Sequence, residues 1–219
     1  MGELAQVRKM VAELEKKESK LDCLVCNAGA LFNDRRESSE GNEITFACHL
    51  LGGSYLLSQL LLPQLRSSTD GRVIFVGSGG MYNTSFPSWD IATNVSKEKY
   101  NGQFAYAYAK RGQVLLAEEF TKSIPEITWV SAHPGWVSTD GVDAAYGESK
   151  KYLEPMRNTW QGAEGIAWLM STQSELKSGG FYLDRVPQPK HVAYGGSFTK
   201  NTPAEVQEML DKLQSAAGL

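Results

Sequence analysis

The chain has 219 residues, 42% of them hydrophobic and 21% charged, and a formal net charge of -3. This composition fits one soluble globular domain with a sizeable core. Lysines and arginines are scattered along the chain, which excludes the concentrated basic surface typical of nucleic-acid binding.

Two stretches were considered as targeting or membrane segments. Residues 1–20 are charged and helix-like rather than a basic stub followed by an apolar core, so they do not form a secretory signal. The apolar stretch around residues 50–62 is interrupted by Gly52 and Gly53 and is too short to cross a bilayer. A cytoplasmic protein is therefore expected.

The first two predicted elements are a helix and a strand. Apolar residues recur at helical spacing over residues 2–17, and residues 21–26 form a short apolar run typical of a strand covered on both faces. Residues 27–29 turn the chain away from this strand. Cys23 and Cys26 would point to opposite faces of it, so we interpret them as packing residues and expect no metal site.

A long helix and a second strand follow. The helix is predicted over residues 43–65 and carries His49 on an apolar stretch. Residues 72–76 are an apolar, β-branched run that ends at glycine, which places Ser78 at the carboxyl tip of a strand, where open α/β sheets bind ligands. The glycine that a hydrolase nucleophile elbow needs two residues before its serine is absent from the sequence, so Ser78 is not expected to be a nucleophile.

The next helix carries a tyrosine and a lysine one turn apart. Residues 82–103 are polar and predict either a functional loop or a disordered insertion. In the helix predicted over residues 104–120, Tyr106 and Lys110 share a face. An ammonium group close by would lower the pKa of the Tyr106 phenol from about 10, which makes Tyr106 a candidate general acid or base. The spacing alone would also suit a core tyrosine and a solvated lysine, and Tyr108 has no cation four residues later.

The last third continues the alternation of strands and helices. Its predicted elements are a strand, an irregular segment, a helix, a strand and a C-terminal helix, over residues 127–132, 140–160, 162–170, 180–184 and 202–213. A capping box, Thr202 with Glu205, begins the last helix. The alternation predicts an α/β fold with a parallel sheet.

Three strand ends and one helix therefore carry, in this order, Asn27-Ala28-Gly29, Ser78, Tyr106 with Lys110, and His133-Pro134-Gly135. This arrangement resembles the short-chain dehydrogenase/reductase family. Within it, residues 76–81, 133–136 and 179–182 resemble the member 12 type. The resemblance implies an incomplete Rossmann-like, doubly wound parallel sheet with about the last four of the family's seven strands.

The resemblance implies roles for four catalytic residues. Ser78 would donate a hydrogen bond to the substrate carbonyl oxygen, Tyr106 would exchange a proton with that oxygen, and Lys110 would lower the pKa of Tyr106 and hold the nicotinamide ribose. His49 falls where the family carries a further catalytic asparagine, and would hold a water in a proton relay. The alternative for His49 is a satisfied core histidine.

The implied cofactor is NAD or NADP, and the implied substrate is an apolar small molecule such as a retinoid, steroid or lipid aldehyde. The implied cofactor contacts are Asn27, Ala28, Gly29, Tyr106, Lys110, Pro134, Gly135, Val137 and Thr139. Residues 140–160 correspond in place to the family's substrate-binding lid.

One part of the family pattern is missing from the sequence. Family members begin with a strand, a glycine-rich turn and a helix, whereas here only Gly2 precedes Gly29. We therefore expect residues 1–219 to be a single truncated domain, with strand 21–26 as an apolar edge and with cofactor binding and activity in doubt. The alternative is a catalytically silent interaction module that associates with full-length partners, or with a second copy, through the helices 43–65 and 104–120.

Overall fold

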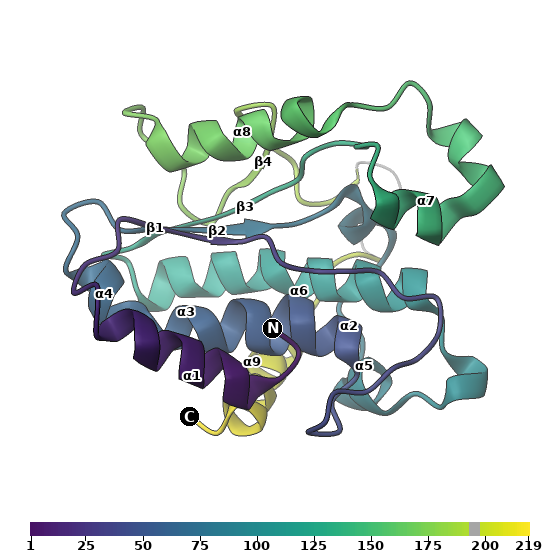
Figure 1. The fold of residues 1–219 in the computed structure, drawn as a ribbon, viewed down its shortest axis with the longest axis horizontal. Coiled ribbons are helices and arrows are strands. Elements are labelled where there is room, and N and C mark those ends of the chain that lie inside the picture. The colour runs from purple at the N-terminus through teal and green to yellow at the C-terminus, as the bar shows by residue number, and fades with distance from the viewer. Residues whose placement is uncertain (193–197) are drawn as a thin grey trace.

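Helices and strands alternate along the chain and build a central sheet with helices on both faces (Figure 1). This computed structural model describes residues 1–192 and 198–219. The strands are β1 Cys23–Cys26, β2 Arg72–Val76, β3 Thr128–Ala132, β4 Phe181–Leu183 and β5 Val186–Gln188. The α-helices are α1 Leu4–Glu15, α2 Ile44–Phe46, α3 Leu57–Leu60, α4 Leu62–Arg66, α5 Trp89–Asn94, α6 Gly102–Ser123, α7 Asp140–Tyr146, α8 Thr159–Ser171 and α9 Pro203–Ala217. The described π-helix is η1 Ala47–Leu56, and the 3-10 segments are η2 Gly79–Asn83, η3 Lys97–Lys99 and η4 Gly147–Leu153.

The strands lie in the order β1-β2-β3-β4-β5, and neighbours from β1 to β4 are parallel. The predicted α/β fold with four parallel strands is confirmed. The fifth strand, β5, was not predicted; it returns from β4 after a two-residue turn and pairs with it antiparallel. Its sequence, Val186-Pro187-Gln188, lacks the apolar run that marks the other strands, because two of its three side chains are exposed.

The catalytic candidates gather at one edge of the sheet because its strands are parallel. Val76 pairs with Ala132 at the ends of β2 and β3. Ser78 and His133 therefore leave the sheet side by side, at the carboxyl edge where open α/β sheets bind ligands.

Strand β1 forms one edge of the sheet and, within the described residues, pairs only with β2. The predicted apolar edge is thus present in the structure. Cys26 packs into the core below the sheet and Cys23 against the cluster above it, which confirms that they point to opposite faces. Burial raises the pKa of Cys26 to about 12 and that of Cys23 to about 11, as expected of packing residues.

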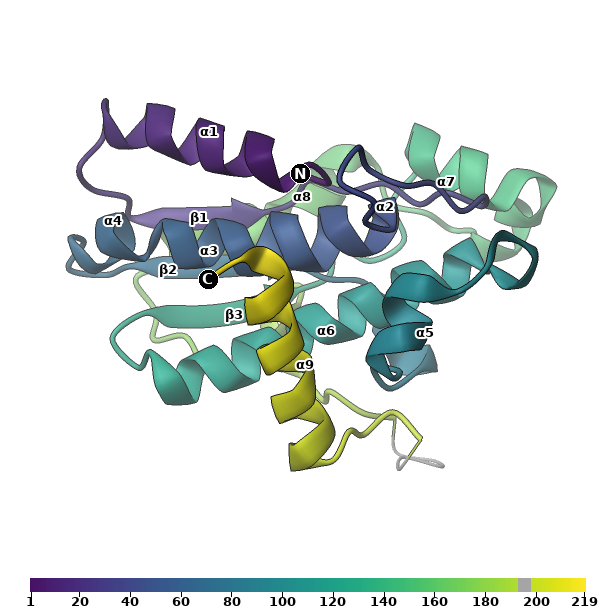
Figure 2. The ribbon, with the colours of Figure 1, turned by 90° about the horizontal axis from the view of Figure 1, so that it is seen from below.

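The lower face of the sheet is covered by a thick layer of helices, namely α1, η1 with α3, α6, and α9 (Figures 1 and 2). Apolar side chains from these helices and from the sheet form one continuous cluster. At its centre, Trp129 of β3 lies 6.1 Å from Phe75 and 4.7 Å from Phe120, measured between ring centroids. This burial is the main source of stability in the fold.

The upper face is covered mainly by α8 (Figure 1). The buried cluster between α8 and the sheet is small and consists of Ile74, Val130, Ala132, Leu169 and Tyr182. A capping box begins α8: Asn158 accepts from the Gln161 backbone N–H, and the Gln161 side chain accepts from the Asn158 N–H.

The helix predicted over residues 43–65 is interrupted and less regular than expected. From Ile44 to Leu60 it is continuous, but ten of its residues are π-helical, and it breaks at Leu61 before Pro63 opens the first turn of α4. The π-helix was not predicted, because local propensity does not distinguish a π-helix from an α-helix. None of the described helices is both long and apolar enough to cross a bilayer.

The segment predicted as a loop or disordered insertion, residues 82–103, is folded. It contains α5 and η3, and Phe86 and Ala92 are buried in it. The Tyr108 hydroxyl donates to the Ala92 carbonyl, at 3.1 Å, and ties this segment to α6. The disordered alternative is therefore wrong, because the segment supplies apolar side chains to the lower core.

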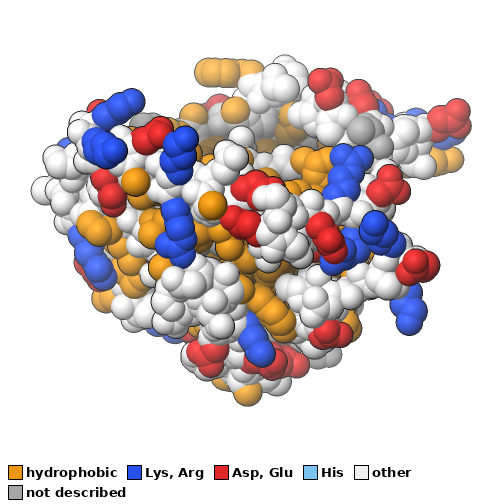
Figure 3. Space-filling model, turned by 60° about the horizontal axis from the view of Figure 1, so that its bottom comes forward, with side chains coloured by type: hydrophobic (Ala, Val, Ile, Leu, Met, Phe, Trp, Pro, Cys, Tyr) orange, Lys and Arg blue, Asp and Glu red, His pale blue; other side chains and the backbone are white. Residues whose placement is uncertain are grey.

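The C-terminal helix α9 was expected from its capping box, and both bonds of that box are present. Figure 2 shows that α9 runs across α3 and α6, on the surface through which association was predicted. Val206, Met209, Leu213 and Ala217 are buried against it. A groove remains beside the helix, lined in part by Tyr55, Phe120, Ile124 and Leu210, and Figure 3 shows apolar side chains gathered on this underside. Association through this surface stays a prediction, and α9 covers part of it.

Candidate active site

Ser78 and Tyr106 meet at the carboxyl edge of the sheet. Strand β2 delivers Ser78 to the first turn of η2, and η2 packs directly against α6. The Ser78 hydroxyl lies close enough to the Tyr106 phenol to favour its ionised form. Ser78 Oγ also accepts from the Gly80 backbone N–H at 3.2 Å, which fixes its rotamer. The structure therefore brings together two groups that lie 28 residues apart in the sequence.

Lys110 lies behind the tyrosine ring, with its ammonium group 5.4 Å from the Tyr106 ring centroid. Its side chain is buried, at 3% exposed, and Nζ donates to the Val76 carbonyl at 2.6 Å. Burial disfavours the charged form and lowers the pKa of Lys110 to about 7. The amine is therefore close to half-protonated at neutral pH.

The expected effect of Lys110 on Tyr106 is not present. Burial raises the pKa of the Tyr106 phenol, and the hydrogen bond from Ser78 opposes this only in part. Lys110 does not lower that pKa because its nitrogen lies over the ring and donates to Val76, and because its own charge is weakened by burial. Tyr106 is thus a proton donor in this structure, not a phenolate.

His49 lies in η1 and packs edge-on against Tyr106, with 5.1 Å between the ring centroids. Its Nε2 is 3.0 Å from the Ala30 carbonyl oxygen. A carbonyl oxygen only accepts, so Nε2 carries the proton and Nδ1 keeps a lone pair. That Nδ1 is buried and has no hydrogen-bond partner among the described residues. Burial, and then the charge of Lys110, hold the pKa of His49 well below its usual value, so the ring is neutral.

The loop after β1 reaches this group through Gly29. A Cβ atom at Gly29 would lie 1.9 Å from the imidazole of His49, so only glycine allows the backbone to approach this closely. Asn27 and Ala28 precede it on the exposed side of the loop. All three loop residues predicted to contact the cofactor are exposed, and Gly29 is the one whose backbone lies against His49.

The turn after β3 lies next to the Ser78 turn: a Cβ at Gly79 would be 3.7 Å from His133. His133 stacks on Phe181 at 5.7 Å, and its Nδ1 accepts from the Gly135 N–H at 3.0 Å. Burial lowers the pKa of His133. These contacts make His133 a packing residue rather than a base. Gly135 has a φ of +78°, a conformation that favours glycine.

Val137 and Thr139 belong to the base of the lid. Val137 forms a bridge with Arg157 and packs against Gly162. The Thr139 hydroxyl accepts from the Val142 N–H at 3.3 Å and caps α7. Both predicted cofactor contacts therefore already hold structural roles, and neither packs into the group around Tyr106.

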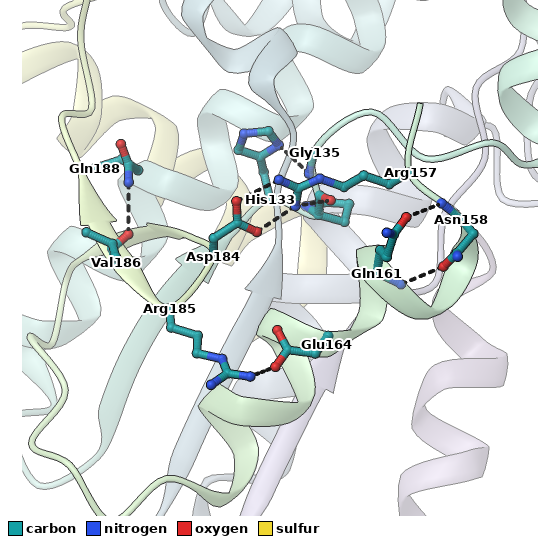
Figure 4. Close-up of polar contacts among 11 residues, drawn as sticks. His133, Gly135, Arg157, Asn158, Gln161, Glu164, Asp184, Arg185, Val186 and Gln188 are labelled. Atoms are coloured by element: carbon teal, nitrogen blue, oxygen red, sulfur yellow. Dashed lines mark hydrogen bonds and ion pairs between the residues drawn. The ribbon is translucent and has the colours of Figure 1, made fainter. Parts of the chain in front are cut away.

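Three residues near the site were missed by sequence reasoning. Tyr146 of α7 is close enough that its charge would raise the pKa of Tyr106, and it packs edge-on against Trp136 at 5.6 Å. Arg157 and Asp184 form an ion pair beside the turn after β3 (Figure 4). They come from distant elements with no shared motif, so no sequence signal indicated them.

The comparisons with known proteins agree with this geometry. Residues 1–88 match the model of the short chain dehydrogenase family. Over 205 residues the chain is 35% identical to human dehydrogenase/reductase SDR family member 12, an alignment that covers 92% of this chain and 63% of that protein. The chain belongs to the short-chain dehydrogenase/reductase family. The resemblance to the member 12 type that the motifs predicted is confirmed.

Two further members of this family illustrate how far the similarity extends. Mouse retinol dehydrogenase 14 is 30% identical over 142 residues, which cover 64% of this chain and 41% of that protein. The crystal structure of NADPH-bound carbonyl reductase from chicken fatty liver superposes with a TM-score of 0.60 at 22% identity, covering 82% of this chain and 70% of that chain. The chain thus spans less than two thirds of the length of its member 12 relative.

Proposed function

We propose that the chain carries the catalytic residues of an NAD(P)-dependent oxidoreductase that interconverts a carbonyl and an alcohol. One observation carries this proposal. The neighbouring hydroxyls of Ser78 and Tyr106 lie at the carboxyl edge of the sheet, with the buried Lys110 behind the tyrosine ring. Two O–H groups side by side can both reach one carbonyl oxygen, and one of them, Tyr106, belongs to a protonated phenol with a raised pKa.

In the direction of reduction, the two hydroxyls have separate tasks. Ser78 Oγ accepts a hydrogen bond from the Gly80 N–H and donates a hydrogen bond to the carbonyl oxygen of the substrate. This bond stabilises the negative charge that develops on that oxygen. Tyr106 then gives its proton to that oxygen. In oxidation Tyr106 takes the proton back from the alcohol.

Lys110 would return the proton to Tyr106, and His49 would hold a water or hydroxyl group along the way. Lys110 has a pKa of about 7, so it can give or accept a proton near neutral pH. The unpartnered Nδ1 of His49 can accept a hydrogen bond from a water or hydroxyl group on the way to Lys110. In this role the neutral imidazole holds the relay in place and does not itself titrate.

The residues present fit the nicotinamide end of the implied cofactor. Lys110 has three donor positions, of which Val76 takes one, and His49 Nδ1 offers a buried acceptor beside it. Gly29 and the turn at residues 133–135 bring backbone to the same place. The cofactor bound there would supply or take up a hydride. For its pyrophosphate, the described part of the chain offers no glycine-rich turn before a helix.

We further propose an apolar small molecule, such as a retinoid, steroid or lipid aldehyde, as the substrate. Trp136, just before the lid, and Tyr146 within it support this class, because they form an aromatic pair and the charge of Tyr146 would reach Tyr106. Aromatic side chains offer large apolar contact area to such a molecule.

The proposal is tested by titrating the purified chain with NADPH and NADH while nicotinamide fluorescence is followed. Turnover is then measured with retinal, a steroid ketone and a medium-chain aldehyde. Tyr106→Phe should lower kcat by about 100-fold or more, since it removes the proton donor. The matched control is Tyr108→Phe on the same helix, whose hydroxyl bonds only to the Ala92 carbonyl among the described residues. It should leave kcat unchanged.

A second candidate function is the catalytically silent interaction module. The groove beside α9 favours it, because the apolar side chains of Tyr55 and Phe120 line that groove in part. Such a module would associate with full-length partners through the parts of helices 43–65 and 104–120 that α9 leaves uncovered. Failure to bind either cofactor at millimolar concentration would favour this candidate and overturn the enzyme.

A further inference from the structure

A single arginine connects three parts of the upper layer (Figure 4). Arg157 stands where the lid ends and α8 is about to begin. Both of its terminal nitrogens donate to Asp184, each at 2.6 Å, and Nη1 also donates to the Pro134 carbonyl at 3.1 Å. This two-pronged pairing fixes the guanidinium plane as well as its position.

Asp184 is presented by a strained hairpin turn. Asp184 and Arg185 are the two residues between β4 and β5, and they have φ angles of +50° and +67°. Such a turn favours glycine or asparagine, and a side chain held there is costly unless the surroundings use it. Both side chains are used: Asp184 pairs with Arg157, and Arg185 pairs with Glu164 of α8.

The guanidinium lies directly against the turn after β3. A Cβ at Gly135 would lie 2.7 Å from Arg157 Nε, so the glycine backbone rests on the arginine. The Gly135 N–H donates to His133 Nδ1, a contact within the turn itself. The turn cannot shift towards α8 without displacing Arg157.

The backbone of Arg157 also pairs with the segment that leads into the lid. Its N–H donates to the Trp136 carbonyl at 2.7 Å, and its carbonyl accepts from the Ser138 N–H at 2.8 Å. Residues 138–156, which include most of the lid, therefore form a loop. The two ends of this loop are joined at Arg157, the residue that supports the turn. If the lid moved about these joined ends, the turn at residues 133–135 would stay in place.

We infer that Arg157, held by Asp184, is a positioning residue. It fixes the position of the turn at residues 133–135 relative to the nicotinamide end of the cofactor. This inference rests on the proposed function for its ligand, but the contacts that carry it are independent of that function. The pair is half-exposed, with 31% of the Arg157 side chain and 56% of the Asp184 side chain accessible. Exposed ion pairs contribute little to global stability, so a positional effect can be separated from unfolding.

Two variants and a matched control test the inference in the full chain. Arg157→Lys keeps the charge but loses the two-pronged pairing, and Asp184→Asn keeps the shape but loses the charge. The control, Glu164→Gln, breaks the other ion pair of the same hairpin, which does not touch the turn. Hydrogen exchange is measured at the Gly135 and Ser138 amides without cofactor, and the Kd for NADPH is measured by fluorescence.

In both variants the amides of Gly135 and Ser138 should exchange about tenfold faster, with thermal unfolding little changed. The Kd for NADPH should rise about tenfold, while Glu164→Gln leaves exchange and Kd as in the parent. Equal changes in exchange and Kd in the variants and the control would overturn the inference, since the hairpin would then have no specific effect on the turn. An unchanged Kd with faster exchange would also overturn it. If the parent itself does not bind NADPH, the proposed function fails, and the exchange result still decides whether Arg157 holds the turn.

Discussion

The two faces of the sheet are covered very differently, and the site is divided between them (Figures 1 and 2). Below the sheet, helices α1, α3, α6 and α9 share one extended apolar cluster with the strands. Above it, α8 covers a small cluster, and the lid and the β4–β5 hairpin are held largely by polar contacts. Tyr106, Lys110 and His49 all stand on elements of the lower layer.

The residues proposed for proton transfer stand in the densely packed lower layer, whereas the lid belongs to the thinner upper layer. A proton donor and its relay need positions that do not vary, and dense apolar packing provides them. A lid must move, and segments that move are drawn from the less stable parts of a fold. Each prediction below compares the layers or measures one of them.

The largest expected effect is the loss of a leucine from the lower core. Leu50 is fully buried in the lower cluster and Leu169 is 1% exposed in the upper one. Leu50→Ala should cost about 4 kcal/mol and Leu169→Ala about 2 kcal/mol, because the thin upper layer can collapse around the cavity. Urea unfolding measures both. Equal costs would mean that the two layers are equally rigid.

The second prediction concerns the cost of burying Lys110. In the unfolded chain its pKa is about 10.4, and in the folded chain about 7. Between these values the unfolded state binds more protons, so stability rises with pH, and below pH 7 the full penalty remains. Lys110→Met should therefore be more stable than the parent below pH 7, by a few kcal/mol.

The gap between Lys110→Met and the parent should close as the pH rises from 7 towards 10. Urea unfolding at pH 6 and pH 9 provides the comparison. A gap that stays constant would show that Lys110 remains charged in the folded chain up to pH 9, so that burial does not lower its pKa. The proton relay proposed above gives a reason for a side chain that destabilises the fold at this position.

The third prediction probes the contact between the β1 loop and η1. Gly29→Ala places a methyl group 1.9 Å from the His49 ring, and overpacking of this kind should cost about 2 kcal/mol. Adding His49→Ala removes the obstacle and should restore part of the loss. A double-mutant cycle in urea measures the coupling, and simple additivity would contradict the contact.

The smallest effect is expected on the outside of the upper layer. Trp160 of α8 is 75% exposed, so Trp160→Ser should change stability by no more than about 0.5 kcal/mol. Thermal unfolding is sufficient to measure it. A cost above about 1 kcal/mol would show that another surface covers this face of α8 in solution, and the upper layer would then be thicker than it is here.

The sequence predicted the parts of this molecule that depend on local patterns. Apolar runs located β1 to β4, and the Thr202 capping box located the start of α9. The meeting of Ser78 with Tyr106 was implied by the family resemblance, whereas parallel strands account for Ser78 lying beside the turn after β3.

The remaining features depend on long-range packing, which local patterns do not encode. The π-helix around His49, the raised pKa of Tyr106 and the Arg157–Asp184 pair each arise from contacts between distant elements. Lys110 shows this most clearly, because its spacing from Tyr106 was correct while its effect on the tyrosine was not. The depth of burial decided that effect.

The place of α9 has a consequence for self-association. The helix lies across α3 and α6 and is fastened at both ends, by Asn201 to the Phe86 backbone and by Arg8 to the Ala217 carbonyl. A second copy could reach the covered part of those helices only after α9 had swung away. Pairing through that surface would therefore be controlled by the release of the chain's own tail, and not by concentration alone.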